Sequence, residues 1–185
     1  MKLMIKTIFS NKSLSAAALV FAVSMLGGCA APSTSKGMTP DSIKTTNKHA
    51  KSVSVNVAGG KETDKIGKSQ IADTAFSQAL VDSINNSKTF SSVIQGKGAD
   101  YLLTVSIFNI DQPSFGFSFT VKMEAGWSLQ RADTGAVVWQ ESIKSEHTAT
   151  TSDAFAGVER LRLANEGAAK NNISQGLSKI SALKL

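Results

Sequence analysis

The clearest pattern in this 185-residue chain is a strict alternation of apolar and polar positions between residues 115 and 130. Such alternation is typical of a β-strand with one face on a hydrophobic core and the other face in water. The apolar positions are Phe115, Phe117, Phe119, Val121, Met123, Ala125, Trp127 and Leu129. We therefore predict one long strand over residues 115–130.

Four upstream segments carry weaker but readable patterns. Alternating valines predict a strand over residues 52–58, which ends at a glycine pair. Residues 69–86 repeat their apolar positions every three or four residues, as an amphipathic helix does. Residues 89–94 are a short strand candidate, and residues 100–111 are apolar on both sides, as expected for a central strand.

The long strand is followed by a turn signal at residues 132–135, which read Ala-Asp-Thr-Gly. We predict a hairpin turn here, with Gly135 at a positive φ. The core face then continues on a returning strand through Val137, Trp139 and Ile143.

The last predicted element is a long helix. Ser152 or Asp153 is expected to cap its N-terminus, and it extends to about Ala182. Its apolar stripe consists of Phe155, Val158, Leu161, Ala168, Ala169, Ile173, Leu177 and Ile180.

The predicted order of elements is therefore β-α-β-β-β-β-α. We expect an α+β domain in which a predominantly antiparallel sheet carries two amphipathic helices on one face. The phenylalanines of the long strand would form the core under these helices, because the helices must bury their own stripes. The alternative is that they line a lipid-binding groove, with Met123 and Trp127 as adaptable walls.

The first 28 residues have the pattern of a secretory signal peptide. The leader contains lysines and no acidic residue, and an apolar run follows from Leu14 to Leu26. With 13 residues, this run is well short of the about 20 that span a bilayer as a helix. It ends at Leu26-Gly27-Gly28-Cys29, which resembles the bacterial lipobox, so we expect cleavage between Gly28 and Cys29.

The resemblance implies that Cys29, the only cysteine of the chain, becomes the first mature residue and carries lipid. Several acyl chains on one residue anchor a protein stably, since each buried CH₂ contributes about 0.8 kcal/mol. Ala30 follows the cysteine where an aspartate would favour retention in the inner membrane. By resemblance to the sorting rule of Gram-negative lipoproteins, we expect an anchor in the outer membrane that faces the periplasm.

After the signal peptide, residues 29–51 read as the lipidated cysteine and a flexible tether rich in Ser, Thr and Lys. Residues 52–185 are then a single periplasmic domain. The leader holds three of the 20 basic residues and none of the 14 acidic ones, so the formal charge of the mature chain is +3. So small a net positive charge does not indicate nucleic-acid binding.

Few residues could supply catalytic or metal chemistry. His49 lies in the expected tether, and His147 lies near the end of a strand without a neighbouring His or Cys at metal-ligand spacing. Ser118 lacks the second glycine of a nucleophile elbow and sits within the predicted long strand. We therefore expect no metal, no cofactor and no enzymatic activity.

Three motifs resemble those of a broad group of small bacterial envelope lipoproteins: FSSV at residues 90–93, ADYLLTV at 99–105 and ADTGAVVW at 132–139. Similar patterns occur in accessory lipoproteins of lipopolysaccharide assembly, curli secretion, peptidoglycan-synthase activation and ABC-type lipid transport. The likeness covers roughly residues 52–182. Its motifs are structural, so the resemblance implies the fold more than a function. It also implies a non-catalytic envelope protein that acts through a partner.

We thus expect an outer-membrane lipoprotein that serves as a non-catalytic binding or accessory module of the cell envelope. Its partner would be an envelope protein, a glycan or a lipid, bound on the solvent face of the long hairpin, since both helices are needed on the other face. The candidate residues are Lys122, Glu124, Gln130 and Lys144, with Ser118, Thr120, Ser128, Gln140 and Ser142 alongside. The alternative function is an envelope hydrolase or acyltransferase with His147 in its site.

The lipid anchor can be tested at its attachment residue. Cys29→Ala should abolish labelling by radioactive palmitate and leave an uncleaved or soluble periplasmic form, because the thiol that carries lipid is absent. Fractionation of the wild-type protein checks the membrane. Recovery with the inner membrane, or palmitate labelling of the variant, would contradict this prediction.

Overall fold

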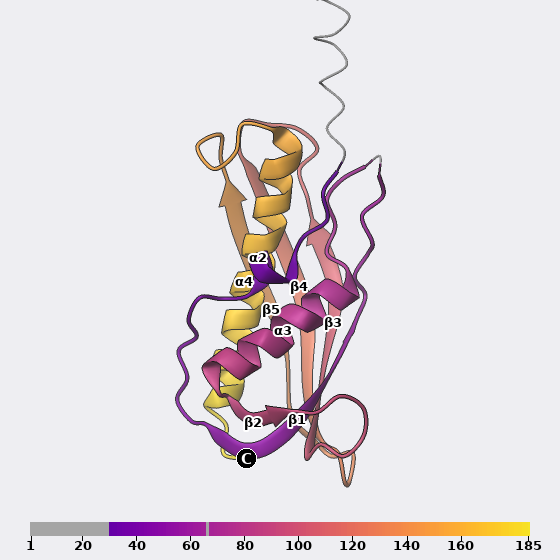
Figure 1. The fold of residues 1–185 in the computed structure, drawn as a ribbon, viewed down its shortest axis with the longest axis vertical. Helices are drawn as coiled ribbons and strands as arrows, with labels where there is room; N and C mark the ends of the chain where they lie inside the picture. The colour runs from indigo at the N-terminus through magenta and orange to yellow at the C-terminus, as the bar shows by residue number, and fades with distance from the viewer. Residues whose placement is uncertain (1–29, 66) are drawn as a thin grey trace, which may run out of the picture.

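The computed structural model describes residues 30–65 and 67–185, so the predicted signal peptide and Cys29 lie outside the described residues. Figure 1 shows a layer of helices on one face of a five-stranded sheet. The elements are α2 (Ser35–Met38), β1 (His49–Ala58), α3 (Asp73–Ser87), β2 (Phe90–Val93), β3 (Tyr101–Asp111), β4 (Phe119–Arg131), β5 (Val137–Ala149) and α4 (Gly157–Ser181). The predicted α+β class is confirmed, and the predicted order is matched apart from the additional helix α2.

The sheet is mixed, which corrects the expectation of a predominantly antiparallel one. Its strand order is β2-β1-β3-β4-β5, with β1 parallel to both β2 and β3, and with β4 antiparallel to β3 and β5. Helix α3 runs back along the sheet between β1 and β2, and such a helical crossover returns the next strand in the same direction. Alternation of apolar residues fixes the buried face of a strand but not the direction of its neighbour.

Helices α3 and α4 cover the same face of the sheet (Figure 1). Helix α3 packs on β1 and β2, whereas α4 packs on β4 and β5. Phe76 and Leu80 of α3 and Ile173 and Leu177 of α4 are fully buried in the core between the layers. The two apolar stripes are thus buried on one sheet face, as the sequence predicted.

The hairpin of β4 and β5 has the predicted turn. Gly135 has a φ of 70°, which confirms the expected left-handed conformation. On the returning strand Ile143 is buried and Trp139 is partly buried, but Val137 is exposed because the pairing shifts register opposite Leu129 and Gln130.

Strand β4 begins at Phe119 and not at residue 115 as predicted. The even–odd alternation holds from there, and Phe119, Val121 and Trp127 face the core. Phe115 and Phe117 instead lie in the loop between β3 and β4, with 88% and 86% of their surface exposed. The ladder ends where Phe119 pairs with the last residue of β5, so the preceding residues have no strand to pair with, whatever their pattern.

Helix α4 begins at Gly157, four to five residues after the predicted caps Ser152 and Asp153. The carboxylate of Asp153 accepts hydrogen bonds from the amide and hydroxyl of Thr150 at 2.7 and 2.9 Å, which closes a turn before the helix and lowers the pKa of Asp153. Phe155 is therefore 96% exposed in the loop, and Val158 is 38% exposed in the first turn. The predicted apolar stripe is correct only from Leu161 onward.

The segment expected to be a flexible tether is packed on the domain, which is a further correction. Thr34 donates from its amide and its hydroxyl to Glu166 of α4, at 2.7 and 2.8 Å. The amide of Ser33 donates to the carbonyl of Gln70 at 3.1 Å, and Met38 is fully buried. A single buried methionine and a few polar contacts give no periodic pattern, so the sequence offered no sign of this packing.

His49, also expected in the tether, is the first residue of β1 and is only 7% exposed. Its Nε2 lies 3.0 Å from the carbonyl oxygen of Ile180, and its ring packs against Phe90 at a centroid distance of 5.4 Å. The histidine therefore joins the start of the sheet to the end of α4, which is a structural role.

The boundary of β4 can be tested with two phenylalanines that are two residues apart. Phe119→Ala should lower the free energy of unfolding by about 3 kcal/mol, because it empties a site in the core. Phe117→Ala should change it by less than about 0.5 kcal/mol, because its ring touches mostly water. Urea denaturation of the two variants measures the difference, and equal losses would contradict the strand boundary.

The packing of residues 33–38 can be tested at Glu166, which accepts bonds from Thr34 and from Arg162. Glu166→Ala should destabilise the protein by about 1–3 kcal/mol, since hydrogen bonds to a charged group are lost. It should also speed hydrogen exchange in residues 33–38. Glu159→Ala is the control, because it removes the other carboxylate on Arg162 without touching Thr34. Similar exchange in both variants would rule out the proposed attachment.

Candidate functional site

The largest hollow on the described part of the domain is an open groove of about 690 Å³ on the outer side of the hairpin. Strands β3, β4 and β5 form its floor, and helix α4 forms one side. Its polar lining residues are Asn109, Asp111, Lys122, Glu124, Lys144, Ser145, Glu146, Asn171, Ser174 and Gln175. Side chains of both charge signs therefore meet amide and hydroxyl groups in this groove.

The charges on the floor are arranged in two rows that cross the strands. In one row Lys122 of β4 pairs with Asp111 of β3 on one side and with Glu146 of β5 on the other. In the second row Glu124 of β4 pairs with Lys144 of β5, and their charged atoms are 3.6 Å apart. Opposite charges on paired residues stabilise a sheet modestly, so the rows fix the positions of these side chains.

A bulge in β3 shapes the upper part of the floor. The pairing of β3 with β4 shifts between Ile107 and Asn109, which leaves Phe108 on the outer face. The ring of Phe108 lies over Gly126 so closely that a Cβ there would be 2.4 Å from it. Bulges re-aim side chains, and this one directs Asn109 to the outer face beside Glu124.

Helix α4 closes the groove on the side of β5, which is one of the two edge strands of the sheet. Asn171 donates from Nδ2 to the carbonyl of Glu146 at 2.8 Å, and Gln175 donates from Nε2 to the carbonyl of Lys144 at 3.4 Å. These bonds satisfy acceptors that an edge strand leaves free, and covering such acceptors prevents strand addition from another chain. The amides also make this wall of the groove polar.

The structure brings together three of the four candidate residues predicted from the sequence. Lys122, Glu124 and Lys144 share the groove. Gln130 lies eight residues beyond Lys122 along β4, or about 26 Å from it. It pairs with Leu102 near the hairpin turn. Asn109 and Asp111 were not predicted from the sequence, although polar residues at the end of an otherwise apolar strand were a usable signal. Asn171 and Gln175 were not predicted either, because nothing in a helical pattern shows which strand edge the helix covers.

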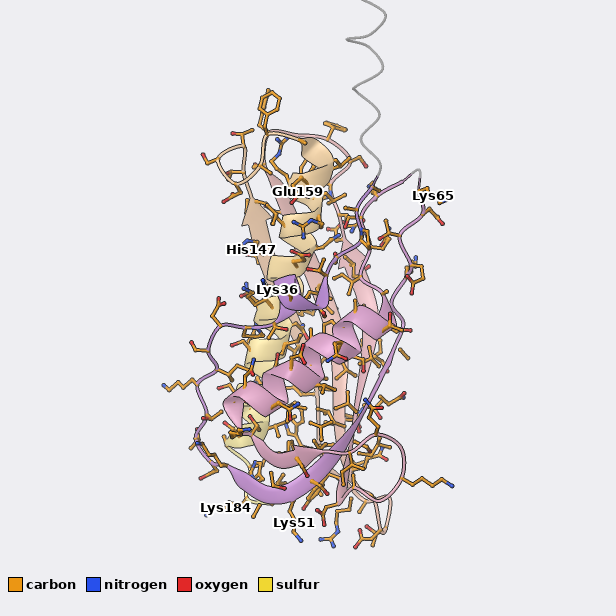
Figure 2. The ribbon with its side chains drawn as sticks, in the orientation of Figure 1. Lys36, Lys51, Lys65, His147, Glu159 and Lys184 are labelled. Atoms are coloured by element: carbon orange, nitrogen blue, oxygen red, sulfur yellow. The ribbon has the colours of Figure 1, made fainter. Side chains whose placement is uncertain are left out.

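His147, the residue of the alternative enzyme hypothesis, is exposed on β5 beside α4 (Figure 2). Its ring lies against Gly167, where a Cβ would be 2.1 Å from the ring atom Cδ2. The side chain does not line the groove. Asp153 lies close enough to His147 for their charges to interact, and this interaction contributes, after the hydrogen bonds from Thr150, to the lowered pKa of Asp153.

A second charged cluster lies at the hairpin turn, beside Lys51. Arg131 binds Asp133 with two hydrogen bonds of 2.8 and 3.1 Å, which lowers the pKa of Asp133 to about 2. The amide and hydroxyl of Ser52 donate to Asp100 at 2.8 and 2.7 Å and lower the pKa of that carboxyl. These groups satisfy one another, which is the arrangement of a structural cluster that holds the turn to β1.

The described residues contain no group of three or more His, Cys, Asp or Glu side chains placed to hold a metal ion. No helix in the same part of the chain is long and apolar enough to cross a membrane.

Comparison with known proteins gives a likeness of fold. No model of a protein family and no curated protein sequence matches the chain. Protein XCC0632 from Xanthomonas campestris superposes with a TM-score of 0.59 at 13% identity, covering 77% of this chain and 89% of that one. The PelC L103M dodecamer from Paraburkholderia phytofirmans gives 0.50 at 17% identity, covering 77% and 95%.

A third structure, uncharacterized lipoprotein B from Nitrosomonas europaea, gives a TM-score of 0.46 at 12% identity and covers 78% of this chain and 87% of that one. This likeness is too weak to support an inference by itself. The first two matches confirm the fold-level resemblance expected from the sequence. Because the identities are below 25%, they show a shared fold and nothing about the site.

Proposed function

We propose that the protein is an outer-membrane lipoprotein whose periplasmic domain is a non-catalytic accessory module that binds another envelope protein. The observation that carries this proposal is the groove between the outer face of the hairpin and helix α4. It places two rows of fixed charges beside a wall of amides, and no other hollow on the described residues combines these features at comparable size.

The anchor in this proposal is supported by the sequence of the leader. Leu26-Gly27-Gly28-Cys29 follows a short apolar run, and Ala30 follows the cysteine. A chain attached to lipid at this residue needs no membrane-spanning helix. The fold that the chain shares with other bacterial proteins is compatible with this placement, but the membrane assignment rests on the lipobox and on Ala30.

The chemistry of the groove favours a polar protein segment as the bound partner. Small-molecule pockets are mostly concave and apolar, whereas this groove is open and has charged and amide groups along its floor and wall. Lys122 and Lys144 can meet carboxylates of a partner, while Glu124 and Glu146 can meet its basic residues. Such complementarity gives specificity more than affinity, as expected of an accessory module that recognises one partner.

The groove can be tested by reversing its two basic charges. Lys122→Glu combined with Lys144→Glu should reduce crosslinking of the lipidated protein to its envelope partner, because like charges then face each other across the interface. We expect the loss of one specific crosslinked species in whole envelopes, with the amount of folded protein unchanged. The reversal also places like charges on paired strand residues, which costs roughly 0.2–1 kcal/mol per pair, too little to unfold the domain.

The matched control is Lys44→Glu combined with Lys97→Glu, which changes the net charge equally at exposed positions outside the groove. Equal loss of crosslinking in both double variants would mean that net charge, and not the groove, is responsible. If His147→Ala abolishes a hydrolytic or acyl-transfer activity of the purified protein, the non-catalytic assignment is wrong.

A further inference from the structure

Three phenylalanines project from one end of the domain without covering any apolar surface. Phe115 and Phe117 lie in the loop between β3 and β4, and Phe155 lies in the loop between β5 and α4. Their exposed fractions are 88%, 86% and 96%. The two loops are adjacent, because Phe119 at the start of β4 pairs with Ala149 at the end of β5. Exposed aromatic groups of this size mark an interaction site on a protein surface.

Arg160 holds the two loops in place. It is only 7% exposed, and its Nη1 donates to the carbonyl of Phe155 at 2.6 Å, while its Nη2 donates to the carbonyl of Gly116 at 3.3 Å. The guanidinium also stacks over the ring of Phe119, 5.3 Å from its centroid. The loops are thus fixed to the first turn of α4, so the three aromatic side chains are presented together on a supported surface.

The N-terminal end of the described chain lies at the same end of the molecule (Figure 1). The amide of Ser33 donates to the carbonyl of Gln70. Gln112, at the start of the loop that carries Phe115 and Phe117, donates to the carbonyl of Ser69, which directly precedes Gln70. Ser33 is four residues from Cys29, a span of at most about 14 Å. A lipid attached to Cys29 would therefore be within reach of the aromatic loops.

We infer that Phe115, Phe117 and Phe155 form a membrane-contacting tip that enters the interfacial region of the leaflet in which the lipid on Cys29 is anchored. The inference rests on the proposed lipid anchor. The anchor keeps the tip at the bilayer surface, so lipid is present at a high effective concentration that no free partner reaches. Phenylalanine is among the residues that bury their apolar side chains at this depth.

Two attachments, the lipid and the tip, fix the orientation of the domain. The hairpin turn then points away from the bilayer, since β4 runs from the tip to the turn over 13 residues, or roughly 43 Å. Figure 2 shows the same polarity in two labelled lysines, with Lys65 near the end that carries the tip and Lys51 at the opposite end.

The tip can be tested with tryptophan at its two loops. The lipidated mature protein would be reconstituted in vesicles of phosphatidylethanolamine and phosphatidylglycerol with brominated acyl chains, which quench tryptophan at membrane depth. Phe117→Trp and Phe155→Trp each add one emitter to the tip, and Val138→Trp adds one at the exposed opposite end as the control. The parent chain, with Trp127 and Trp139, gives the background emission.

We expect the emission added at both tip positions to shift to shorter wavelength and to be mostly lost to the bromines, while the emission added at position 138 stays unquenched. If the protein is anchored in the vesicles but none of the three added tryptophans is quenched, the inference of a membrane-contacting tip is wrong while the lipid anchor stands. A shift to shorter wavelength that grows with the protein-to-lipid ratio and occurs without quenching indicates contact with a second copy and also overturns it. Protein that remains in solution overturns the lipid anchor, and with it this inference.

Discussion

The packing of Trp127 against helix α4 is the contact on which the rest of the domain depends. The indole is fully buried in β4, its Nε1 donates to Asn172 at 2.9 Å, and Asn172 in turn donates to the carbonyl of Ile143 on β5. The ring lies so close to α4 that a Cβ on Gly176 would be 2.6 Å from it. One glycine and one asparagine therefore set how near the helix approaches and tie it to both strands of the hairpin. A larger residue at Gly176 would push the helix from the core, and the loss of Asn172 would leave a buried indole N–H without an acceptor.

This close approach also creates the outer features of the molecule. Because α4 packs closely on the hairpin, the side-chain amides of Asn171 and Gln175 reach the free carbonyls of β5. These amides cover the edge of the sheet and form the wall of the groove. At its first turn the same helix supplies Arg160, which gathers the two aromatic loops. Further along, Glu166 receives the N-terminal segment through Thr34. The tip thus lies at the first turn of α4 and the groove beside the middle of the same helix, so the core fixes their relative positions.

The domain has the properties that an accessory module at a membrane surface needs. The proposed anchor and the aromatic tip are at one end, and the charged turn with Arg131 and Asp133 is at the other. The groove runs along the flank between them, where a partner could reach it without displacing the tip. The packed segment of residues 33–38 matters here, because a long flexible tether would let the domain tumble, whereas a short attached one restricts its orientation.

The sequence by itself determined the five strands, the helices α3 and α4, the buried face of β4 from Phe119 onward and the hairpin turn at Gly135. These features depend on local periodicity and on one backbone conformation. It also contained the motif at Cys29 that resembles a lipobox, which is a local pattern. Only the tertiary structure decided where β4 and α4 begin, since Phe117 and Phe155 continue an apolar pattern into loops that lack a partner strand or a helical turn. The parallel pairing of β1, the packing of Thr34 on Glu166 and the assembly of Asn109, Lys122 and Asn171 into one groove also came from the structure. They join residues far apart in the chain, and hydrophobic periodicity carries no information about which distant surfaces meet.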